Sequence, residues 1–284
     1  MQHNFRTIFV ILFIFTFISN DIKSQNLIPN PSFEYHTACP DLYSQNDSSY
    51  GGLNMKTLRF VPPWTQPTNG TSDFFYDCGN VDQFFLPRIP IQNGKGFTAI
   101  LLSYNASNQY VFDTSCLIRN NREYIQAPLL STLKANQKYY LSFWIHPAPV
   151  SDWFTDAIGA YFTPDAISNF VDPFRYNTTL SGTPQISNPI GRFISDTTRW
   201  TKIEGTFTAT GNEKYITIGN FKGDMETTVT GRNGDNKSII GCTRVIDTPL
   251  DAYVMIDNLN LLECSSNKTI VLNTDTVKFC FGVT

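Results

Sequence analysis

Two stretches at opposite ends of the chain decide the fold: NLIPNPSFE at residues 26–34 and AYVMIDNLNLL at residues 252–262. The second stretch alternates, which predicts a β-strand. One face of that strand would carry Met255, Asp257, Leu259 and Leu261. A lone buried carboxylate is costly, so Asp257 must be paired, hydrogen-bonded or bound to a metal. We expect the first stretch to be the neighbouring strand, with Glu34 beside Asp257.

Two adjacent carboxylates repel each other, and a hard cation between them would relieve that repulsion. The sequence therefore predicts a structural calcium ion at Glu34 and Asp257. Calcium takes six to eight oxygen ligands, so backbone carbonyls near Asn26 or in the turn at residues 94–96 would have to contribute. The alternative is that Asp257 accepts hydrogen bonds from backbone amides while Glu34 is solvated.

Both stretches resemble the opening and closing motifs of galactose-binding-like jelly rolls, the fold of many carbohydrate-binding modules. The resemblance is closer to the N-terminal sandwich of secreted Bacteroidetes cell-surface proteins and covers residues 25–264. The shared segments, in order, are TSDFF from residue 71, REYI from 122, IGAYF from 158, WTKIEGTFTA from 200 and YITIGNF from 215. This resemblance implies an all-β jelly-roll β-sandwich. In that family the Glu of the first motif and the Asp of the last strand hold calcium.

Composition agrees with an all-β protein. The 284 residues include 23 Phe and 13 Tyr, only 16% are charged, and the formal net charge is -3. Aromatic residues favour strands, and no basic patch suggests nucleic acid as a partner. The apolar runs predict nine or ten strands with long loops. We expect a loop at residues 147–156, another at 223–249, and a hairpin in which a turn at 211–212 pairs two neighbouring strands.

Residues 138–146 alternate well and predict another strand. Tyr139, Leu141, Phe143 and Ile145 would share one face, and Tyr140, Ser142, Trp144 and His146 the other. The first of these faces is apolar and suits the core. The second is polar and aromatic, which fits either a ligand-facing sheet or a second covered layer.

The first 24 residues have the pattern of a secretory signal peptide. Arg6 precedes an apolar run at residues 7–18 that is short for a membrane span, and a polar stretch follows. We expect export to the cell surface or medium, with no membrane span after signal cleavage. Residues 25–264 would form the domain. Residues 265–284 resemble the opening of an immunoglobulin-like repeat, which predicts a linker or a truncated repeat.

All six cysteines follow the predicted signal peptide. In an exported protein, cysteines are more often disulfides than metal ligands. The connectivity cannot be derived from sequence, and we predict Cys39–Cys78, with Cys242–Cys264 as a further pair. Cys280 belongs to the C-terminal tail.

Sugar binding is the leading functional prediction. Aromatic rings stack on the apolar face of a sugar, while amides and charged groups bond its hydroxyls. The candidate ligand-binding residues are Trp153, Phe154, Tyr104, Tyr110, Arg122, Glu123 and Asn220. A structural or adhesive module acting through protein contacts at the cell surface is the alternative. It predicts buried aromatic residues and sheets coated with Thr, Ser and Asn.

An enzyme is not expected. After the signal peptide the chain holds two histidines, His36 and His146, and neither lies in a metal-ligand pattern. The sequence contains neither a G-x-S-x-G nor an H-E-x-x-H motif.

Overall fold

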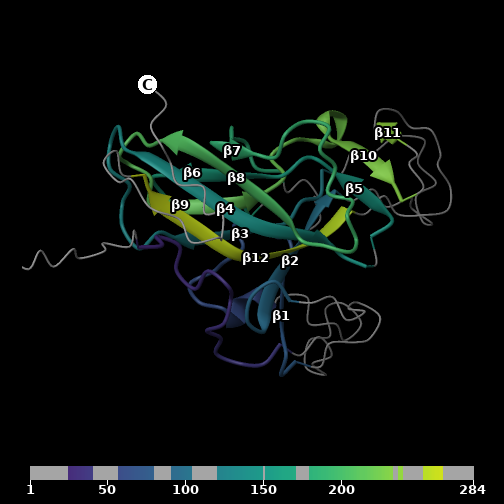
Figure 1. Ribbon diagram of the computed structural model, residues 1–284, viewed down its shortest axis with the longest axis horizontal. Helices are drawn as coiled ribbons and strands as arrows, with labels where there is room; N and C mark the ends of the chain where they lie inside the picture. Colours follow the sequence, from purple (N-terminus) through teal and green to yellow (C-terminus); the bar gives the residue numbers. More distant parts are fainter. Residues whose placement is uncertain are drawn as a thin grey trace, which may run out of the picture.

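The computed structural model describes residues 25–40, 57–79, 91–103, 120–149, 151–170, 179–232, 236–238 and 252–264. Within these segments the regular structure consists of twelve β-strands and two short 3-10 helices (Figure 1). The predicted signal peptide at residues 1–24 and the tail at 265–284 lie outside the described residues.

The larger sheet has five antiparallel strands in the order β1-β2-β12-β4-β8. Their bounds are β1 (Asp73–Tyr76), β2 (Gly96–Ser103), β12 (Ala252–Glu263), β4 (Lys138–Pro147) and β8 (Thr201–Thr208). The strand predicted at residues 138–146 is confirmed as β4. The closing strand β12 lies at the centre of this sheet, between β2 and β4.

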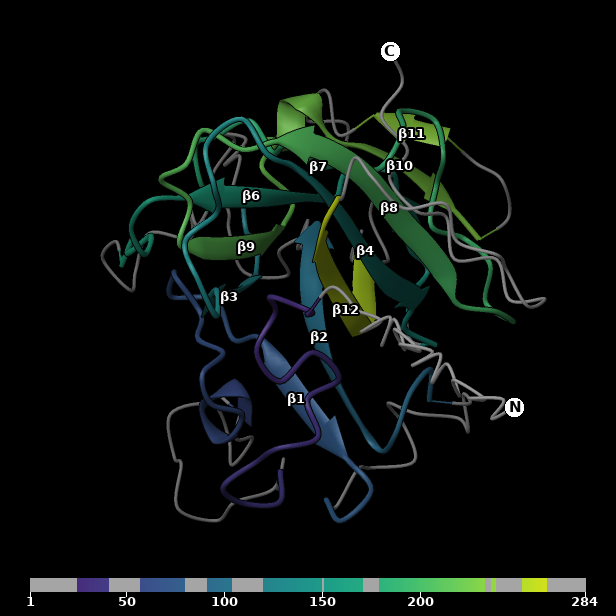
Figure 2. The same cartoon turned by 60° about the vertical axis from the view of Figure 1, so that its left-hand side comes forward.

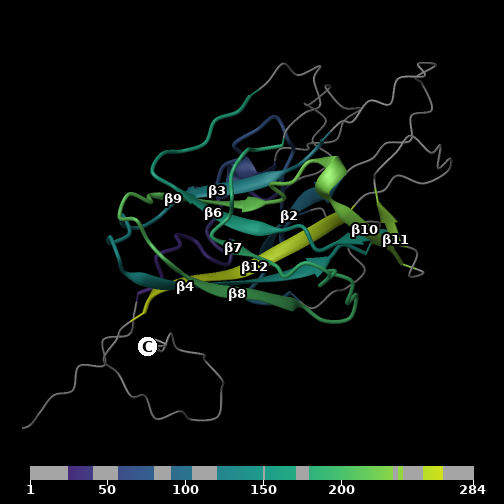
Figure 3. The ribbon, with the colours of Figure 1, turned by 90° about the horizontal axis from the view of Figure 1, so that it is seen from above.

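A second antiparallel sheet faces the first, in the order β3-β9-β6-β7. Its strands are β3 (Tyr124–Pro128), β9 (Tyr215–Gly219), β6 (Gly159–Thr163) and β7 (Ile186–Ser187). Apolar side chains of both sheets form one core, in which the Phe162 and Phe207 rings stack with centroids 4.5 Å apart. Figure 3 shows the two layers edge-on. The predicted all-β sandwich is therefore confirmed, with more strands than the nine or ten expected.

A small third sheet stands at one end of the sandwich, in the order β11-β10-β5. Its strands are β5 (Trp153–Thr155), β10 (Thr228–Gly231) and β11 (Asn236–Ser238). The expectation that residues 147–156 form only a loop was wrong, because β5 pairs with β10 in this sheet. The segment 223–249, also expected to be a loop, contains the 3-10 helix η3 (Asp224–Glu226) and strands β10 and β11.

The opening stretch runs beside β12 as predicted, but it is not a strand. The Leu27 amide donates to the Leu261 carbonyl at 2.9 Å, and the Leu259 amide donates to the Pro31 carbonyl at 2.9 Å. Proline lacks the amide hydrogen that a strand ladder needs, and Asn30 and Phe33 have left-handed φ values of 43° and 57°. The stretch therefore follows β12 through isolated bonds. Figure 2 shows residues 25–40 in purple near β1.

Trp64 anchors this opening stretch to the sandwich. Its side chain is buried, its ring lies 5.2 Å from Phe33, and its Nε1 donates to the Asn30 carbonyl at 3.1 Å. The preceding 3-10 helix η2 (Thr57–Phe60) contacts β1, where the Phe74 amide donates to the Thr57 hydroxyl at 2.7 Å.

The expected strict alternation of β12 was wrong. A β-bulge interrupts its pairing with β4 between Asp257 and Asn260, and Asn258 there has a left-handed φ of 52°. A bulge adds one residue to one strand and so exchanges its faces. The core side chains of β12 are accordingly Val254, Ile256, Leu259 and Leu261. Met255 belongs instead to a cluster on the outer side of the sheet.

The predicted hairpin between β8 and β9 was also wrong. Strand β8 pairs with β4, whereas β9 pairs with β3 and β6, so the intervening turn crosses from one sheet to the other. The turn itself is present, with Gly211 at φ 99° and its α-carbon packed against Ala135. The apolar residues of the two strands therefore cover opposite sides of the same core.

The bulge at Asn258 generates a stability prediction. Asn258→Val should lower the free energy of unfolding by about 1–2 kcal/mol relative to Asn258→Gly, because a β-branched residue is disfavoured at positive φ. Both variants lose the bond from the Asn258 side-chain Nδ2 to Gln92, so this bond does not contribute to the difference between them. Urea unfolding of both proteins measures it. Equal stabilities would contradict a left-handed residue at this position.

Candidate ligand-binding face and acidic pair

One outer surface of the sandwich combines aromatic and charged side chains. Strand β4 contributes Tyr140, Ser142 and Trp144, and the neighbouring strand β8 contributes Lys202 and Glu204. We call these five residues the β4/β8 face. Pairing of β4 with β8 sets Trp144 opposite Lys202 and Ser142 opposite Glu204. Trp144 and Lys202 are half-buried and Glu204 is exposed, so the surface is accessible from solvent.

The charged groups of this face are held in a fixed arrangement. The Lys202 amine donates to the Tyr140 hydroxyl at 3.0 Å and lies 3.1 Å from the Glu204 carboxylate. Tyr140 in turn donates to Glu204. The same amine lies 5.6 Å from the Tyr140 ring and 6.0 Å from the Trp144 ring. An ammonium ion over an aromatic ring is attracted to it, so these contacts orient the rings as well as the charges.

Lys202 keeps its charge in this setting. Partial burial alone would lower its pKa, but the hydrogen bonds to Tyr140 and Glu204 outweigh this effect and raise the pKa. Burial raises the pKa of Tyr140, and its bond to Glu204 adds to the increase. At neutral pH the face therefore offers a cation, a carboxylate and a neutral phenol next to an indole ring.

The opposite outer surface, on the four-stranded sheet, is covered by the chain itself. The Gln126 side chain donates to the Ile167 carbonyl at 3.1 Å and accepts from the Ile167 amide at 2.8 Å. The Thr217 hydroxyl also donates to Gln126 at 3.0 Å. Further along, the Leu180 amide donates to the Tyr124 hydroxyl at 3.0 Å. Of the two sheets of the sandwich, the five-stranded one reaches solvent on its outer side at Trp144, Lys202 and Glu204, while Tyr140 and Ser142 are buried there.

The acidic pair predicted from the two end motifs converges on one turn. Glu34 is exposed, and its Oε1 accepts from the amides of Lys95 and Gly96 at 2.7 and 2.8 Å. Asp257 is fully buried, and its carboxylate accepts from the amides of Asn93 and Asn258 at 2.8 and 2.6 Å. The turn between Ile91 and β2 therefore lies against both carboxylates.

Two properties of this turn bear on whether it could hold a cation. Removal of water raises the pKa of Asp257 to about 7, and the negative charge of Glu34 contributes to the increase. A Cβ on Gly94, whose φ is 69°, would lie 2.2 Å from a Glu34 oxygen, so glycine allows the backbone to approach the carboxylate. Carboxylate oxygens are ligands that calcium prefers, whereas the backbone groups that contact both carboxylates here are N–H donors. The amide bonds to Asp257 also match the alternative stated for this residue.

The predicted polar ligand-binding residues lie inside the protein. Arg122 is buried and forms an ion pair with Asp224 at 2.7 Å, and it donates to the Asn121 carbonyl at 2.7 Å. The Asn220 side chain donates to the Leu102 carbonyl at 2.8 Å and to the Thr227 hydroxyl at 3.0 Å. These bonds tie β2 and β9 to the segment around η3.

The predicted aromatic ligand-binding residues are also internal where they are described. Trp153 and Phe154 are 7% and 4% exposed in β5, and the Arg232 guanidinium lies 5.5 Å from the Phe154 ring centroid. Tyr104 and Tyr110 lie outside the described residues. A role for this set in ligand binding stays a prediction, and the structure brings its described members to no shared open surface.

Glu123, the remaining member of that set, is buried and forms an acidic cluster with the half-buried Asp73. Its carboxylate accepts from the Thr71 amide at 2.9 Å, the Thr71 hydroxyl at 2.7 Å and the Leu101 amide at 2.9 Å. Asp73 lies nearby and accepts a hydrogen bond from the Tyr253 hydroxyl. Burial and the charge of Glu123 raise the pKa of Asp73 well above its usual range, although the bond from Tyr253 partly offsets the increase.

This cluster predicts a pH dependence of stability. Because folding raises the pKa of Asp73, the stabilising contribution of its proton is present at low pH and lost as pH rises from about 4 toward the folded-state pKa. The free energy of unfolding of the wild type should therefore fall with pH relative to that of Asp73→Asn. Urea unfolding between about pH 4.5 and pH 8 measures the two slopes.

Asp77→Asn is the matched control, since Asp77 lies just after β1 but is exposed and paired with Lys95. It should keep the wild-type slope. Parallel curves for the wild type and Asp73→Asn would show that Asp73 does not hold a proton in the folded state.

The predicted Cys39–Cys78 disulfide is confirmed, with the two α-carbons 5.7 Å apart. It joins the end of the opening stretch to the turn after β1. Cys264 is disulfide-bonded as well. Cys242 lies outside the described residues, so the Cys242–Cys264 pairing stays a prediction.

The sequence analysis named three of the five residues of the β4/β8 face in advance, Tyr140, Ser142 and Trp144. Alternation in β4 singled out Tyr140 and Trp144 as members of a surface that could meet a ligand, but loop residues were preferred as ligand contacts. The outward placement of Lys202 and Glu204 follows from alternation in β8. Their position beside Trp144 depends on strand pairing, for which the sequence holds no local signal.

No helix in the described segments is long and apolar enough to cross a membrane. No family model matches the sequence, and no curated protein matches it.

Comparison with solved structures finds distant likenesses. The CBM22-1 xylan-binding domain of Xyn10C from Paenibacillus barcinonensis has 9% identity and a TM-score of 0.35, covering 70% of this chain and 85% of that domain. The K1 cleaved adhesin domain of Lys-gingipain from Porphyromonas gingivalis has 11% identity and a TM-score of 0.30, covering 70% and 89%. A Bacteroides thetaiotaomicron protein proposed to bind sugar has 10% identity and a TM-score of 0.33, covering 84% and 100%. At this distance the likenesses assign no function to the chain.

Proposed function

We propose that this protein is a non-catalytic carbohydrate-binding module that holds a glycan on the β4/β8 face. The observation that carries the proposal is the solvent-accessible group of Trp144, Lys202 and Glu204 on the outer side of β4 and β8. The buried Tyr140 and Ser142 lie beneath this group, and the outer surface of the four-stranded sheet is covered by the chain itself. In this proposal residues 1–24 direct export, residues 25–264 form the module, and it acts outside the cell.

The side chains of this face supply the two kinds of contact that a sugar needs. The half-buried Trp144 ring presents an apolar surface for the C–H groups of a pyranose ring. The Lys202 amine can donate hydrogen bonds to the sugar hydroxyls, and the Glu204 carboxylate can accept hydrogen bonds from them. Because Lys202, Tyr140 and Glu204 already hold one another in place, little side-chain freedom would be lost on binding.

A structural or adhesive module without a small ligand is the second candidate. The burial of Trp153 and Phe154 supports it, because these two aromatic residues pack inside the protein rather than forming a platform. Cell-surface proteins would then be the partners. The two candidates differ in whether the β4/β8 face binds a soluble glycan.

Replacement of Trp144 separates the two candidates. Trp144→Ala should weaken binding at least tenfold, a loss of about 1.4 kcal/mol, to any oligosaccharide that the wild type binds on a glycan array. Isothermal titration with the highest-ranking oligosaccharide measures the loss. Phe170→Ala is the matched control, because Phe170 is 59% exposed beside the covered sheet, and it should keep wild-type affinity.

Two outcomes would contradict the proposal. A folded wild type that binds nothing on the array would favour the adhesive module. Binding that Trp144→Ala leaves unchanged would place the glycan elsewhere than on the β4/β8 face.

We further propose that Glu34 and Asp257 hold a structural calcium ion at the turn before β2. Support comes from the convergence of both carboxylates on that turn and from the burial of Asp257. The ion would neutralise both charges and join the opening stretch to β12. Backbone carbonyls and water would complete its ligands, since calcium needs more oxygens than two carboxylates provide.

Chelation tests the calcium proposal. EDTA should lower the thermal midpoint of the wild type by several degrees, because a ligand that binds only the folded state stabilises it. Asp257→Asn should have a lower midpoint that EDTA leaves unchanged. Differential scanning calorimetry with and without calcium measures both. A wild type that is indifferent to EDTA would instead support simple capping of the backbone amides by Asp257.

A further inference from the structure

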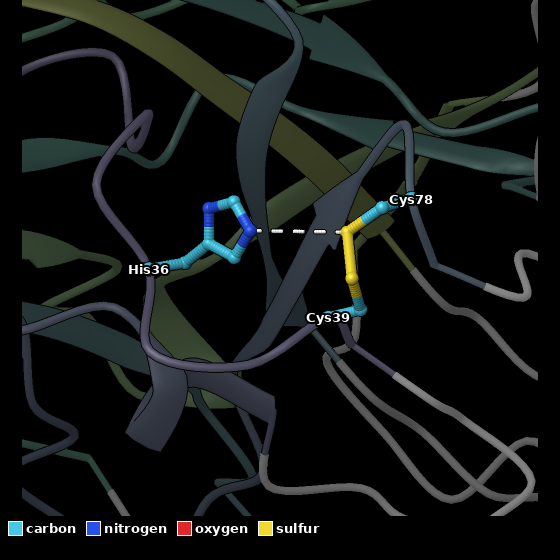
Figure 4. Close-up of side chains that lie close together, drawn as sticks. All are labelled: His36, Cys39 and Cys78. Carbon is cyan, nitrogen blue, oxygen red and sulfur yellow. Dashed lines mark hydrogen bonds between the residues drawn. A yellow bond between two sulfur atoms is a disulfide. The ribbon is translucent and has the colours of Figure 1, made fainter.

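A histidine lies beside the Cys39–Cys78 disulfide, two residues after Glu34 of the acidic pair and apart from the β4/β8 face. The His36 Nε2 is 3.8 Å from the Cys78 sulfur (Figure 4). One ligand atom from each of His36, Cys39 and Cys78 lies within 4.8 Å of the other two. Both cysteines are exposed and the histidine is half-buried, so small molecules in solution can reach all three.

Hydrogen bonding determines which histidine nitrogen faces the sulfur. The Nδ1 atom lies 3.1 Å from the Glu34 carbonyl oxygen, which can only accept, so Nδ1 carries the hydrogen. In the neutral ring Nε2 then presents its lone pair toward Cys78. Metal-binding histidines typically donate their other ring N–H to a carbonyl or carboxylate in this way.

The ring is also held in position by neighbouring aromatic residues. Its centroid lies 4.1 Å from that of Tyr76 and 5.8 Å from that of Phe74, both on β1. The disulfide ties residue 39 to residue 78, two positions after the end of β1. His36 is therefore anchored to the strand independently of the disulfide.

These distances suit a tetrahedral zinc site. Zinc–sulfur and zinc–nitrogen bonds of about 2.3 and 2.05 Å place neighbouring tetrahedral ligands about 3.6–3.8 Å apart. The observed separation of 3.8 Å between Nε2 and the Cys78 sulfur is about 0.2 Å longer than the roughly 3.6 Å expected for a nitrogen and a sulfur on one zinc ion. Once the S–S bond is broken, the two sulfurs need to separate only to a similar distance, which side-chain rotation allows.

We propose that reduction of the Cys39–Cys78 disulfide creates a zinc site made of His36 Nε2 and the two thiolates. A dithiol reductant supplies two electrons and two protons, which convert the disulfide into two thiols while the reductant becomes a disulfide. Zn²⁺ then displaces the two thiol protons and binds both sulfurs and the imidazole. The fourth position remains open to water. The disulfide and the bound metal exclude each other, and either one joins the opening stretch to β1.

Cobalt is the probe for this site, because Co²⁺ bound to thiolates absorbs visible and near-ultraviolet light. The full chain is reduced with a dithiol, freed of reductant without air, and titrated with Co²⁺. We expect thiolate-to-cobalt and tetrahedral d–d bands from the reduced protein but not from the oxidised protein. Addition of Zn²⁺ should remove the bands by displacement. Circular dichroism of the same samples reports whether the fold is retained.

Two variants identify the ligands. Cys39→Ser/Cys78→Ser keeps the other four cysteines, and it should lack the bands. His36→Phe keeps an aromatic ring against Tyr76 but removes the nitrogen, and it should weaken Co²⁺ binding at least tenfold. Equal bands in either variant and the wild type would overturn the proposal, because other cysteines would then bind the metal. A reduced wild type without bands would overturn it as well, whether folded or not.

Discussion

The structure depends on how the closing strand is held at the centre of the larger sheet. Strand β12 pairs with β2 on one side and with β4 on the other, and the opening stretch bonds to it at Leu259 and Leu261. Residues from the two ends of the domain thus meet on one strand. Because the last strand pairs with elements from earlier in the chain, most strand pairing in the sandwich is long-range in sequence, and the sandwich is incomplete until β12 is in place.

The bulge in β12 keeps apolar side chains in the core along both halves of the strand and also places Asp257 at the turn before β2. Before the bulge, Val254 and Ile256 face the core while Met255 faces outward; after it, Leu259 and Leu261 face the core. Without the extra residue, the second half of the strand would turn its apolar side chains to solvent. The left-handed Asn258 accommodates this change directly after Asp257. The buried Asp257 carboxylate therefore lies next to the turn whose amides also bind Glu34.

The two sheets differ in what covers them, and this difference locates the proposed glycan site. Gln126 and Tyr124 bind segments of the long connection after β6, which close the outer surface of the four-stranded sheet. The aromatic and charged side chains of β4 and β8 bond mainly to one another. The disulfide with its neighbouring histidine lies apart from this face, at the end of β1, so its chemistry can change without altering the β4/β8 face.

The sequence by itself determined the fold class, the position of most strands and the meeting of the two end motifs. It did so because alternation and turn residues are local properties of the chain. Only the tertiary structure decided the bulge in β12, the crossing of the chain between β8 and β9, and the burial of Trp153 and Arg122. Each of these depends on which strands become neighbours, and that choice is made by packing the whole core. A candidate aromatic residue looks the same in sequence whether the folded chain buries it or leaves it open.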